Sequence, residues 1–359
     1  MKDQIHFTIK PEHLAVLGKI SGVTLSPVSP FRYGKETDTA AGIAQLAALG
    51  ICDAGGTITA DKKDAVLSLA LAEAFTRIYL TTPQRVIEYL AYFAPDGKMA
   101  GMTNDNGMQL ITFPAPNNAM LELVRQTIGV SRYRSIPFEA KLNRAETLVF
   151  SAMIDLQRKE MLRKFADGKT ADRVAVSGKD VQEMLKIPPG NIQWLSSAFT
   201  DLFRQERIPK AGDTAGIFAS LTAKGLITTT GRDYSLSDPA VILARNHLMP
   251  SMYLTLTSGK GQSSGKTNIA GFSCIISGIQ DLLYIDYNAD DIEIEAVSSA
   301  TIHEYVKTFL TDRSVLAAMD TEPSAAPAAV KQERHFCPQC GGALKPGLKF
   351  CSNCGAKIS

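Results

Sequence analysis

The chain has 359 residues, of which 45% are hydrophobic and 21% are charged, a composition that excludes a collagen-like or wholly disordered protein. Its 38 basic and 36 acidic side chains leave a formal net charge of +2, which excludes a strong overall attraction to nucleic acid or anionic membranes. The sequence has no run of 18 apolar residues and begins without a signal-peptide core. We therefore expect a cytoplasmic protein without a membrane span.

The first half of the chain, expected over residues 1–130, shows an α+β pattern. A helix is predicted to end at Gly50, because glycine readily adopts the left-handed backbone that caps helices. Another helix follows near residues 60–75. Alternating apolar residues and turn signals then predict antiparallel strands, and a closing helix is expected over Asn118–Ile128. The predicted strands are Arg85–Phe93, Lys98–Thr103 and Met108–Phe113.

The second half, expected over residues 131–319, begins with connecting helices. Apolar residues at helical spacing predict an amphipathic helix over Glu139–Phe165, and two shorter helices follow over Ser177–Leu185 and Asn191–Phe203. The pattern of the first half then returns, with a helix that ends at Gly225. The further predicted elements are a helix near 238–250, strands Met252–Thr257, Gly271–Ser277, Asp281–Asp286 and Ile292–Ala296, and a closing helix Ala300–Ala318.

Three pairs of short segments indicate an internal duplication. They recur in the same order at offsets of 175, 174 and 182 residues. The pairs are Leu46–Ile51 with Leu221–Leu226, Ile78–Thr81 with Met252–Thr255, and Glu122–Arg125 with Glu304–Lys307. The fold predicted for the body is therefore α+β, with two similar halves of antiparallel strands and flanking helices.

This arrangement resembles the EspG-like proteins that are associated with ESX (type VII) secretion, over about residues 5–318. The residues that carry the resemblance are Leu46–Gly56 with Asn118–Gly129, and Leu221–Gly231 with Thr301–Leu310. The resemblance implies a non-catalytic chaperone that binds another protein, such as a secreted substrate, through sheet and loop surfaces. The cysteine-rich tail of this chain is a departure from the family pattern.

Four of the six cysteines lie in the last 23 residues, as two CxxC pairs separated by ten residues. Each pair places two sulfurs on one tight turn, and two such turns supply the four thiolates that tetrahedral Zn²⁺ prefers. With all four positions filled by cysteine, no position stays open for a catalytic water. We predict a structural zinc ribbon over residues 335–359, similar to the short zinc-ribbon tails of other proteins. Its ligands are Cys337, Cys340, Cys351 and Cys354.

Residues 320–334 separate the body from the predicted ribbon and are rich in proline, alanine and polar residues. Such a composition is typical of a flexible linker. A tethered ribbon raises the local concentration of whatever it recognises beside the body, an arrangement that suits an adaptor.

The segment Ser258–Thr267 has a superficial likeness to a phosphate-binding loop. That motif requires a glycine at position 260, which here is Lys260, and the residues that follow predict a strand in place of a helix. We therefore predict a hairpin loop.

The segment 177–237 resembles the helices and wing of a winged-helix domain, so a DNA-binding transcription regulator is the alternative function. Its candidate recognition helix, Asn191–Phe203, contains no lysine or arginine, although phosphate contacts usually supply much of the affinity for DNA. Basic residues nearby keep this alternative open. They are Arg204, Arg207, Lys210, Lys224 and Arg232.

No Ser-His-Asp, Cys-His or dinucleotide-binding pattern occurs, so we predict no catalytic or cofactor-binding residues. The function expected from the sequence is a non-enzymatic protein-binding adaptor or chaperone that carries a tethered structural zinc ribbon.

Overall fold

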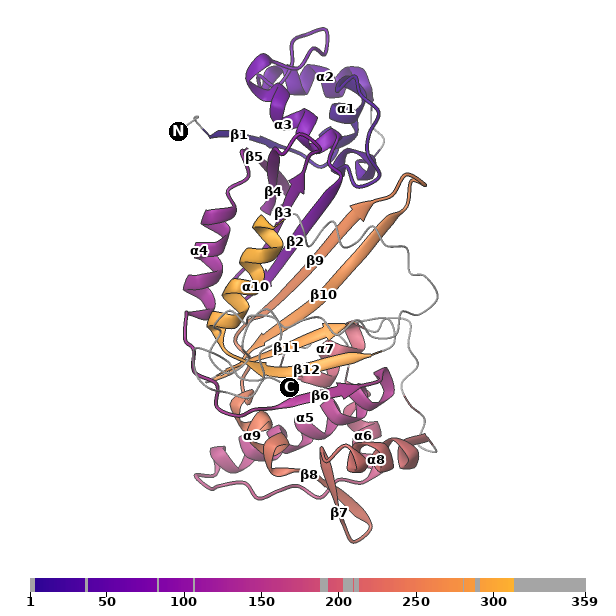
Figure 1. Ribbon diagram of the computed structural model, residues 1–359, viewed down its shortest axis with the longest axis vertical. Coiled ribbons are helices and arrows are strands. Elements are labelled where there is room, and N and C mark those ends of the chain that lie inside the picture. The colour runs from indigo at the N-terminus through magenta and orange to yellow at the C-terminus, as the bar shows by residue number, and fades with distance from the viewer. Residues whose placement is uncertain are drawn as a thin grey trace, which may run out of the picture. The chain divides into compact units, whose positions relative to one another are not determined.

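The computed structural model describes residues 4–35, 38–82, 84–105, 107–187, 193–202, 209, 213–279, 281–287 and 291–312. These residues form helices and a large antiparallel sheet (Figure 1), which confirms the α+β class. Within this part of the chain, every helix is too short or too polar to cross a membrane. The expected linker (320–334) and zinc ribbon (335–359) lie outside the described residues.

The part of the chain up to Gly129 alternates short helices with strands. Its elements in chain order are β1 (Ile5–Ile9), α1 (His13–Ile20), the 3-10 helix η1 (Pro30–Tyr33), α2 (Thr39–Ala48), α3 (Ala60–Ala70), β2 (Ala74–Thr81), β3 (Val86–Phe93), β4 (Met99–Asp105), β5 (Met108–Phe113) and α4 (Asn117–Ile128).

The rest of the chain repeats this order and adds helices after its first strand. Its elements are β6 (Glu139–Leu142), α5 (Arg144–Ala166), α6 (Gly178–Met184), α7 (Leu195–Leu202), α8 (Thr214–Ala223), β7 (Ile227–Thr230), β8 (Asp233–Leu236), α9 (Asp238–Asn246), β9 (Tyr253–Gly261), β10 (Thr267–Ser277), β11 (Leu282–Tyr287), β12 (Ile292–Val297) and α10 (Ser299–Thr311).

The two halves share one strand order. Neighbouring strands are β1-β5-β4-β3-β2 in the first half and β6-β12-β11-β10-β9 in the second. In each half the first strand pairs antiparallel with the last, with Phe7 opposite Ile111 and Ala140 opposite Ile294. The topology therefore confirms the two similar halves that the sequence predicts.

The helix ends that mark the repeat also match in detail. Gly50 and Gly225 have φ angles of 68° and 70°, a backbone region that glycine enters without a steric penalty. After each glycine the chain turns back, so that the N–H of Ile51 donates to the Leu46 carbonyl at 3.0 Å and that of Leu226 to the Leu221 carbonyl at 3.1 Å. Both are glycine-type helix caps.

Contacts group the described residues into two compact units. Unit 1 contains the residues up to Gly129, Leu254–Phe272 and those from Ile302 onward, and unit 2 contains Val130–Tyr253 and Ser273–Thr301. Unit 1 thus includes β9 from Leu254 onward, part of β10 and most of α10 from the second half. The boundaries expected at residues 130 and 319 were placed according to the repeat in the sequence. The two units are defined by contacts in the structure, so the two divisions of the chain differ.

Polar contacts join α10 to β2 and to the start of α4 within unit 1. The Thr76 hydroxyl donates to the Phe309 carbonyl at 2.8 Å, and the Asn117 amide donates to the Leu310 carbonyl at 2.8 Å. Asn117 in turn accepts a hydrogen bond of 2.7 Å from the hydroxyl of buried Tyr89. The end of α10 is therefore tied to residues that precede it by more than 190 positions.

Helix α5 lies at the centre of unit 2. The sequence predicts an amphipathic helix from Glu139, but α5 begins at Arg144, and residues 139–142 form β6 instead. Residues 146–155 are all buried, because α6, α7, α8, α9 and β6 pack around this helix. A helix segment covered on all sides needs apolar or internally paired residues on every face, so the amphipathic interpretation is wrong for residues 146–155, whereas Lys159, Arg163 and Phe165 near the end of α5 are exposed.

Candidate functional site

Among the described residues, the strand β6 ends the strand order in unit 2 and pairs with β12 alone. The Ala296 N–H donates to the Phe138 carbonyl, and backbone groups alternate between the two sides of a strand. The backbone of Ala140 and Leu142 therefore faces β12. That of Glu139 and Lys141 points to the outer edge, where a further strand would pair.

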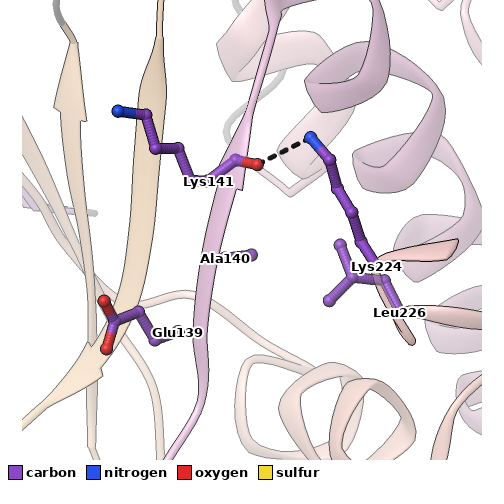
Figure 2. A pocket seen from close by; sticks show the side chains of 5 residues that line it. All are labelled: Glu139, Ala140, Lys141, Lys224 and Leu226. Atoms are coloured by element: carbon purple, nitrogen blue, oxygen red, sulfur yellow. Dashed lines mark hydrogen bonds between the residues drawn. The ribbon is translucent and has the colours of Figure 1, made fainter. Parts of the chain in front are cut away.

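A hollow of about 290 Å³ lies along this outer edge. Figure 2 shows β6 on one side of it, with Lys224 and Leu226 on the other. The hollow begins at the strand backbone, since the side chain of Ala140 is small. Its lining residues are Glu139, Ala140, Lys141, Lys224 and Leu226.

The side chain of Lys224 extends across this hollow and connects β6 to the start of α5. Its ammonium donates to the Lys141 carbonyl at 2.8 Å and to Oε2 of Glu146 at 2.7 Å. Glu146 also closes a capping box at the start of α5, because the Asn143 N–H donates to its carboxylate and the Glu146 N–H donates to the Asn143 side chain. The Lys141 carbonyl at the strand edge and the Glu146 carboxylate in the first turn of α5 thus both accept hydrogen bonds from the ammonium of Lys224.

The pKa of Glu146 reflects these contacts. Burial alone would raise it, but the hydrogen bonds from Lys224, from the Ser220 hydroxyl and from the Asn143 N–H together hold the pKa below its usual value. The carboxylate therefore remains ionised at neutral pH and keeps the ammonium of Lys224 beside the strand edge.

The arrangement is suited to binding an extended segment. The lining residues include no serine, cysteine or histidine, which are common nucleophiles and general bases. The Lys141 side chain is engaged with Asp291 at 2.8 Å. The groups at this edge that a partner could contact are therefore mainly backbone groups. An exposed edge strand binds an additional strand through backbone hydrogen bonds.

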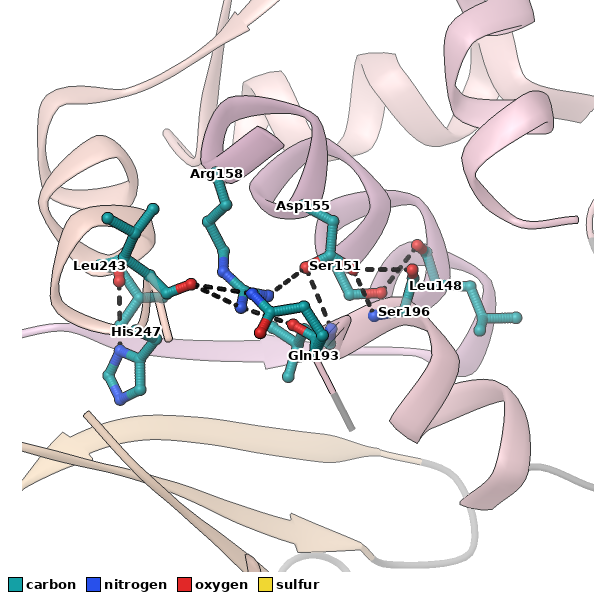
Figure 3. A network of polar contacts seen from close by, with 10 residues as sticks. Leu148, Ser151, Asp155, Arg158, Gln193, Ser196, Leu243 and His247 are labelled. Carbon is teal, nitrogen blue, oxygen red and sulfur yellow. Dashed lines mark hydrogen bonds and ion pairs between the residues drawn. The ribbon is translucent and has the colours of Figure 1, made fainter. Parts of the chain in front are cut away.

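A buried ion pair in α5 supports the helices behind this edge (Figure 3). Asp155 and Arg158 are almost completely inaccessible and pair with one another. The Asp155 carboxylate also accepts hydrogen bonds from the N–H groups of Leu195 at 3.0 Å and Ser196 at 2.7 Å, which are the first residues of α7. An acid at a helix N-terminus satisfies otherwise unpaired N–H groups, so this network is structural.

The guanidinium of Arg158 completes the network by donating to two carbonyl groups. These belong to Gln193 and Leu248, and the Trp194 ring lies 5.6 Å from the guanidinium carbon. With its charge paired with Asp155 and one guanidinium nitrogen donating to both carbonyls, Arg158 connects α5 to the residues just before α7 and just after α9.

His247 is a buried titratable group beside this network and forms no ion pair among the described residues (Figure 3). Its Nδ1 lies 3.1 Å from the Leu243 carbonyl, and its Nε2 has no hydrogen-bond partner among the described residues. Burial lowers the pKa of His247 below its usual value, against the influence of the Asp281 carboxylate and with that of Arg158. The imidazole is therefore neutral at pH 7.

Residues 177–237, the segment considered for DNA binding, contain helices and a two-stranded hairpin. α6 and α7 correspond to the predicted helices, β7 and β8 form a hairpin, and Val176 pairs with Tyr234 beside it. Neither α7 nor α8 contains a lysine or arginine, and Ser196 and Phe199 of α7 are buried. Three of the basic residues that favour DNA binding, Arg204, Arg207 and Lys210, lie outside the described residues, and DNA binding stays a prediction.

The segment with a likeness to a phosphate-binding loop is a hairpin, as predicted. β9 extends to Gly261 and β10 begins at Thr267, and the Gln262 N–H donates to the Lys266 carbonyl at 2.8 Å across the turn. Because a strand follows this turn, the segment has no helix N-terminus to hold a phosphate.

The four predicted zinc ligands, Cys337, Cys340, Cys351 and Cys354, lie outside the described residues. Within the described part of the chain, no group of three or more His, Cys, Asp or Glu side chains could hold a metal ion. Cys52 is buried with its thiol free, and burial raises its pKa, so it is not a reactive thiolate.

Sequence reasoning did not identify the β6 edge. Residues 139–142 were expected in a helix, although Glu139-Ala140-Lys141-Leu142 alternates between polar and apolar residues as a half-buried strand does. Asn143 followed by Glu146 also has the spacing of a capping box and could have shown where the helix begins. No local signal could show that β6 is an edge strand, because that depends on the order of the sheet.

Comparison with solved structures finds a similarity to EspG5, a type VII secretion system chaperone of Mycobacterium tuberculosis, in its complex with the PE25–PPE41 dimer. The match has a TM-score of 0.47 and 10% sequence identity, and it covers 85% of this chain and 96% of that chain. No family model matches the chain, and no curated protein matches it.

Proposed function

We propose that this protein is a non-enzymatic adaptor or chaperone that binds another protein at the outer edge of β6. The observation that supports the proposal is the orientation of the Lys141 backbone, whose N–H faces the outer edge of β6 and whose carbonyl accepts a hydrogen bond from Lys224 across the hollow of about 290 Å³. An extended segment of the partner would pair with this N–H as part of an added strand and would share the carbonyl with Lys224 or displace it. The resemblance to EspG-like proteins extends the proposal to a secreted protein as that partner, bound in the cytoplasm.

We further propose that residues 335–359 form a structural zinc ribbon, tethered to the body by residues 320–334. Cys337, Cys340, Cys351 and Cys354 would bind one Zn²⁺ as thiolates. The ribbon would be folded by its metal, because a segment of this length has almost no apolar core. Its test is given among the predictions below.

The test of the β6 edge uses two substitutions at one residue. Lys141→Pro removes the outward N–H and leaves the groups of Ala140 and Leu142 that pair with β12, since proline is tolerated at the open side of edge strands. Lys141→Ala is the matched control, because it also loses the ion pair with Asp291 but keeps the N–H. Trp194, the single tryptophan, reports on the fold of unit 2 in both variants.

Full-length tagged protein would be used to capture partners from native lysate of the source cells, with and without nuclease. We expect a protein partner that resists nuclease, is retained by Lys141→Ala and is lost with Lys141→Pro. Equal retention by the two variants would overturn the assignment to β6. Loss of all captured material with nuclease would favour the DNA-binding regulator instead.

A further inference from the structure

A second hollow, of about 410 Å³, lies in unit 1 between α1 and η1. It exists because two glycines bring the chain close to α1. A Cβ added at Gly34 would lie 2.4 Å from the backbone nitrogen of Ala15, and one at Gly18 would lie 3.1 Å from the Cβ of Phe31. Without side chains at these positions, the floor is apolar and recessed. The lining residues are Ala15, Gly18, Lys19, Leu25, Phe31, Arg32 and Gly34.

Two cations line this apolar floor without an acidic partner. Arg32 is exposed and takes part in no ion pair or hydrogen bond among the described residues, and Lys19 donates only to the Thr39 hydroxyl, at 3.0 Å. Two other arginines of unit 1 pair with acids, Arg77 with Glu88 at 2.7 Å and Arg125 with Glu122 at 2.6 Å.

Among the described residues, the acid nearest to Arg32 in sequence is Asp38, and its carboxylate is occupied in capping a helix. Asp38 caps α2, where its carboxylate accepts a hydrogen bond of 2.9 Å from the Ala40 N–H. The hollow therefore combines an apolar floor with a positive charge that this part of the chain does not neutralise.

We propose that this hollow binds an acidic segment of a partner protein, with an apolar side chain on the floor and carboxylates beside Arg32 and Lys19. The guanidinium offers paired donors that match the two oxygens of a carboxylate, and burial of a leucine or phenylalanine on the floor adds apolar stabilisation. A nucleic acid fits less well, because its affinity comes from many phosphate contacts and this hollow offers two cations. The inference is independent of β6, since the hollow lies in the other unit.

The probe is an acetylated and amidated peptide of sequence Asp-Leu-Asp-Phe-Asp-Leu. Binding to the full-length, isotope-labelled protein would be followed by the amide resonances of Gly18, Phe31 and Gly34, which line the hollow, and titration would give Kd. One control peptide replaces aspartate by lysine, and another replaces leucine and phenylalanine by serine. We expect only the acidic, apolar peptide to shift these resonances.

Two charge reversals then assign the binding to the hollow. Arg32→Glu should weaken binding about tenfold, the effect of losing one charge-assisted hydrogen bond. Lys63→Glu, which reverses an exposed lysine of α3 in the same unit, should leave Kd unchanged. Thermal unfolding of both variants establishes that the fold is kept. The proposal is overturned if the acidic peptide leaves the three resonances unmoved, if the lysine peptide binds equally, or if the two variants weaken binding alike.

Discussion

Leu49 and Lys224 occupy equivalent positions, each directly before the glycine that ends a matching helix, yet their surroundings differ. Leu49 is 52% exposed, whereas Lys224 donates to the Lys141 carbonyl and to Glu146. The two halves therefore share this helix end but differ in the residue directly before its glycine. Only the second half has an ammonium at this position.

Substitution of Lys224 by leucine, the residue of the first half, should destabilise unit 2 by about 1 to 3 kcal/mol, because Glu146 would stay buried without its cation. Urea unfolding followed by Trp194 fluorescence would measure the change. Lys186→Leu is the control, since Lys186 pairs with Glu183 on the surface and such pairs contribute less than about 1 kcal/mol. Equal losses in the two variants would contradict the role given to Lys224.

The contact between Lys224 and Glu146 also predicts how the free energy of unfolding depends on pH. The pKa of Glu146 is lower in the folded protein than in the unfolded chain, so the unfolded chain takes up the proton first as the pH falls. The stabilisation from this carboxylate is complete above about pH 4.3, its unfolded pKa, and is lost as the pH falls through the folded pKa. In Lys224→Leu this acid-dependent loss should shrink, and titration of unfolding free energy between pH 3 and 6 would detect it.

Removal of the buried guanidinium should have a larger effect. Arg158→Met leaves the Asp155 carboxylate buried without its partner, and we expect a loss of about 3 to 5 kcal/mol. Arg163→Met on the same helix removes an exposed pair with Glu160 and should cost less than about 1 kcal/mol. Thermal and urea unfolding compare the two, and a loss at Arg158 as small as that at Arg163 would disprove the network.

His247 should make unit 2 less stable in mildly acidic solution. Burial lowers its pKa in the folded protein, so between the unfolded pKa of about 6.5 and the folded value only the unfolded chain binds the proton. Stability is complete above about pH 6.5 and falls by up to about 1.4 kcal/mol per pH unit below it.

The decisive readout is the slope of unfolding free energy against pH from 7 to 5, because it is independent of the starting stability of each variant. His247→Gln should flatten the slope. His303→Gln, which changes a histidine of unit 1, should leave the Trp194-detected slope as it is, and an unchanged slope in His247→Gln would refute the assignment.

The positive φ of Gly225 gives a test of the repeat at the level of the backbone. Gly225→Ala should destabilise unit 2 by about 1 to 2 kcal/mol through strain alone, since an added Cβ meets no atom within 4 Å. Gly216→Ala within α8 also places a methyl group in open space, and we expect it to stabilise the helix by about 0.5 kcal/mol. Opposite signs in denaturant unfolding are the expected result.

The zinc prediction is checked by metal analysis of the purified chain. We expect one zinc ion per chain, lost on treatment with a thiol-modifying reagent and absent from Cys351→Ser. Cys52→Ser should keep its zinc, because Cys52 is buried in unit 1. A metal-free wild-type protein purified without chelators would rule out the ribbon.

The sequence predicts the repeat of the fold well because its signals are local. Gly50 and Gly225 mark helix ends, and turn residues separate the strands β3, β4 and β5. The strand β2 was not predicted, although Ala74, Thr76, Ile78 and Leu80 alternate as its buried face. The apolar residues of α3 are followed almost directly by those of β2, so the change from helical to strand spacing of apolar residues is hard to locate in the sequence.

The site depends on relationships that no sequence window contains. Edge status of β6 follows from its pairing with β12, about 150 residues later. From the sequence, Lys224 was considered as a cation that could contact DNA. Its contacts with Glu146 and the Lys141 carbonyl span 78 and 83 positions, so no local pattern indicates them. The packing of α10 in unit 1 is equally remote from any local pattern.

The bonds from Thr76 and Asn117 to α10 also determine when the body can be completed during synthesis. The Thr76 hydroxyl reaches a carbonyl 233 residues further along, so the early strands leave the ribosome before the helix that satisfies their buried groups. At about 5 to 20 residues per second, this interval lasts on the order of ten seconds or longer. A nascent chain that stalls before residue 299 would leave the Thr76 hydroxyl and the Asn117 amide without these partners.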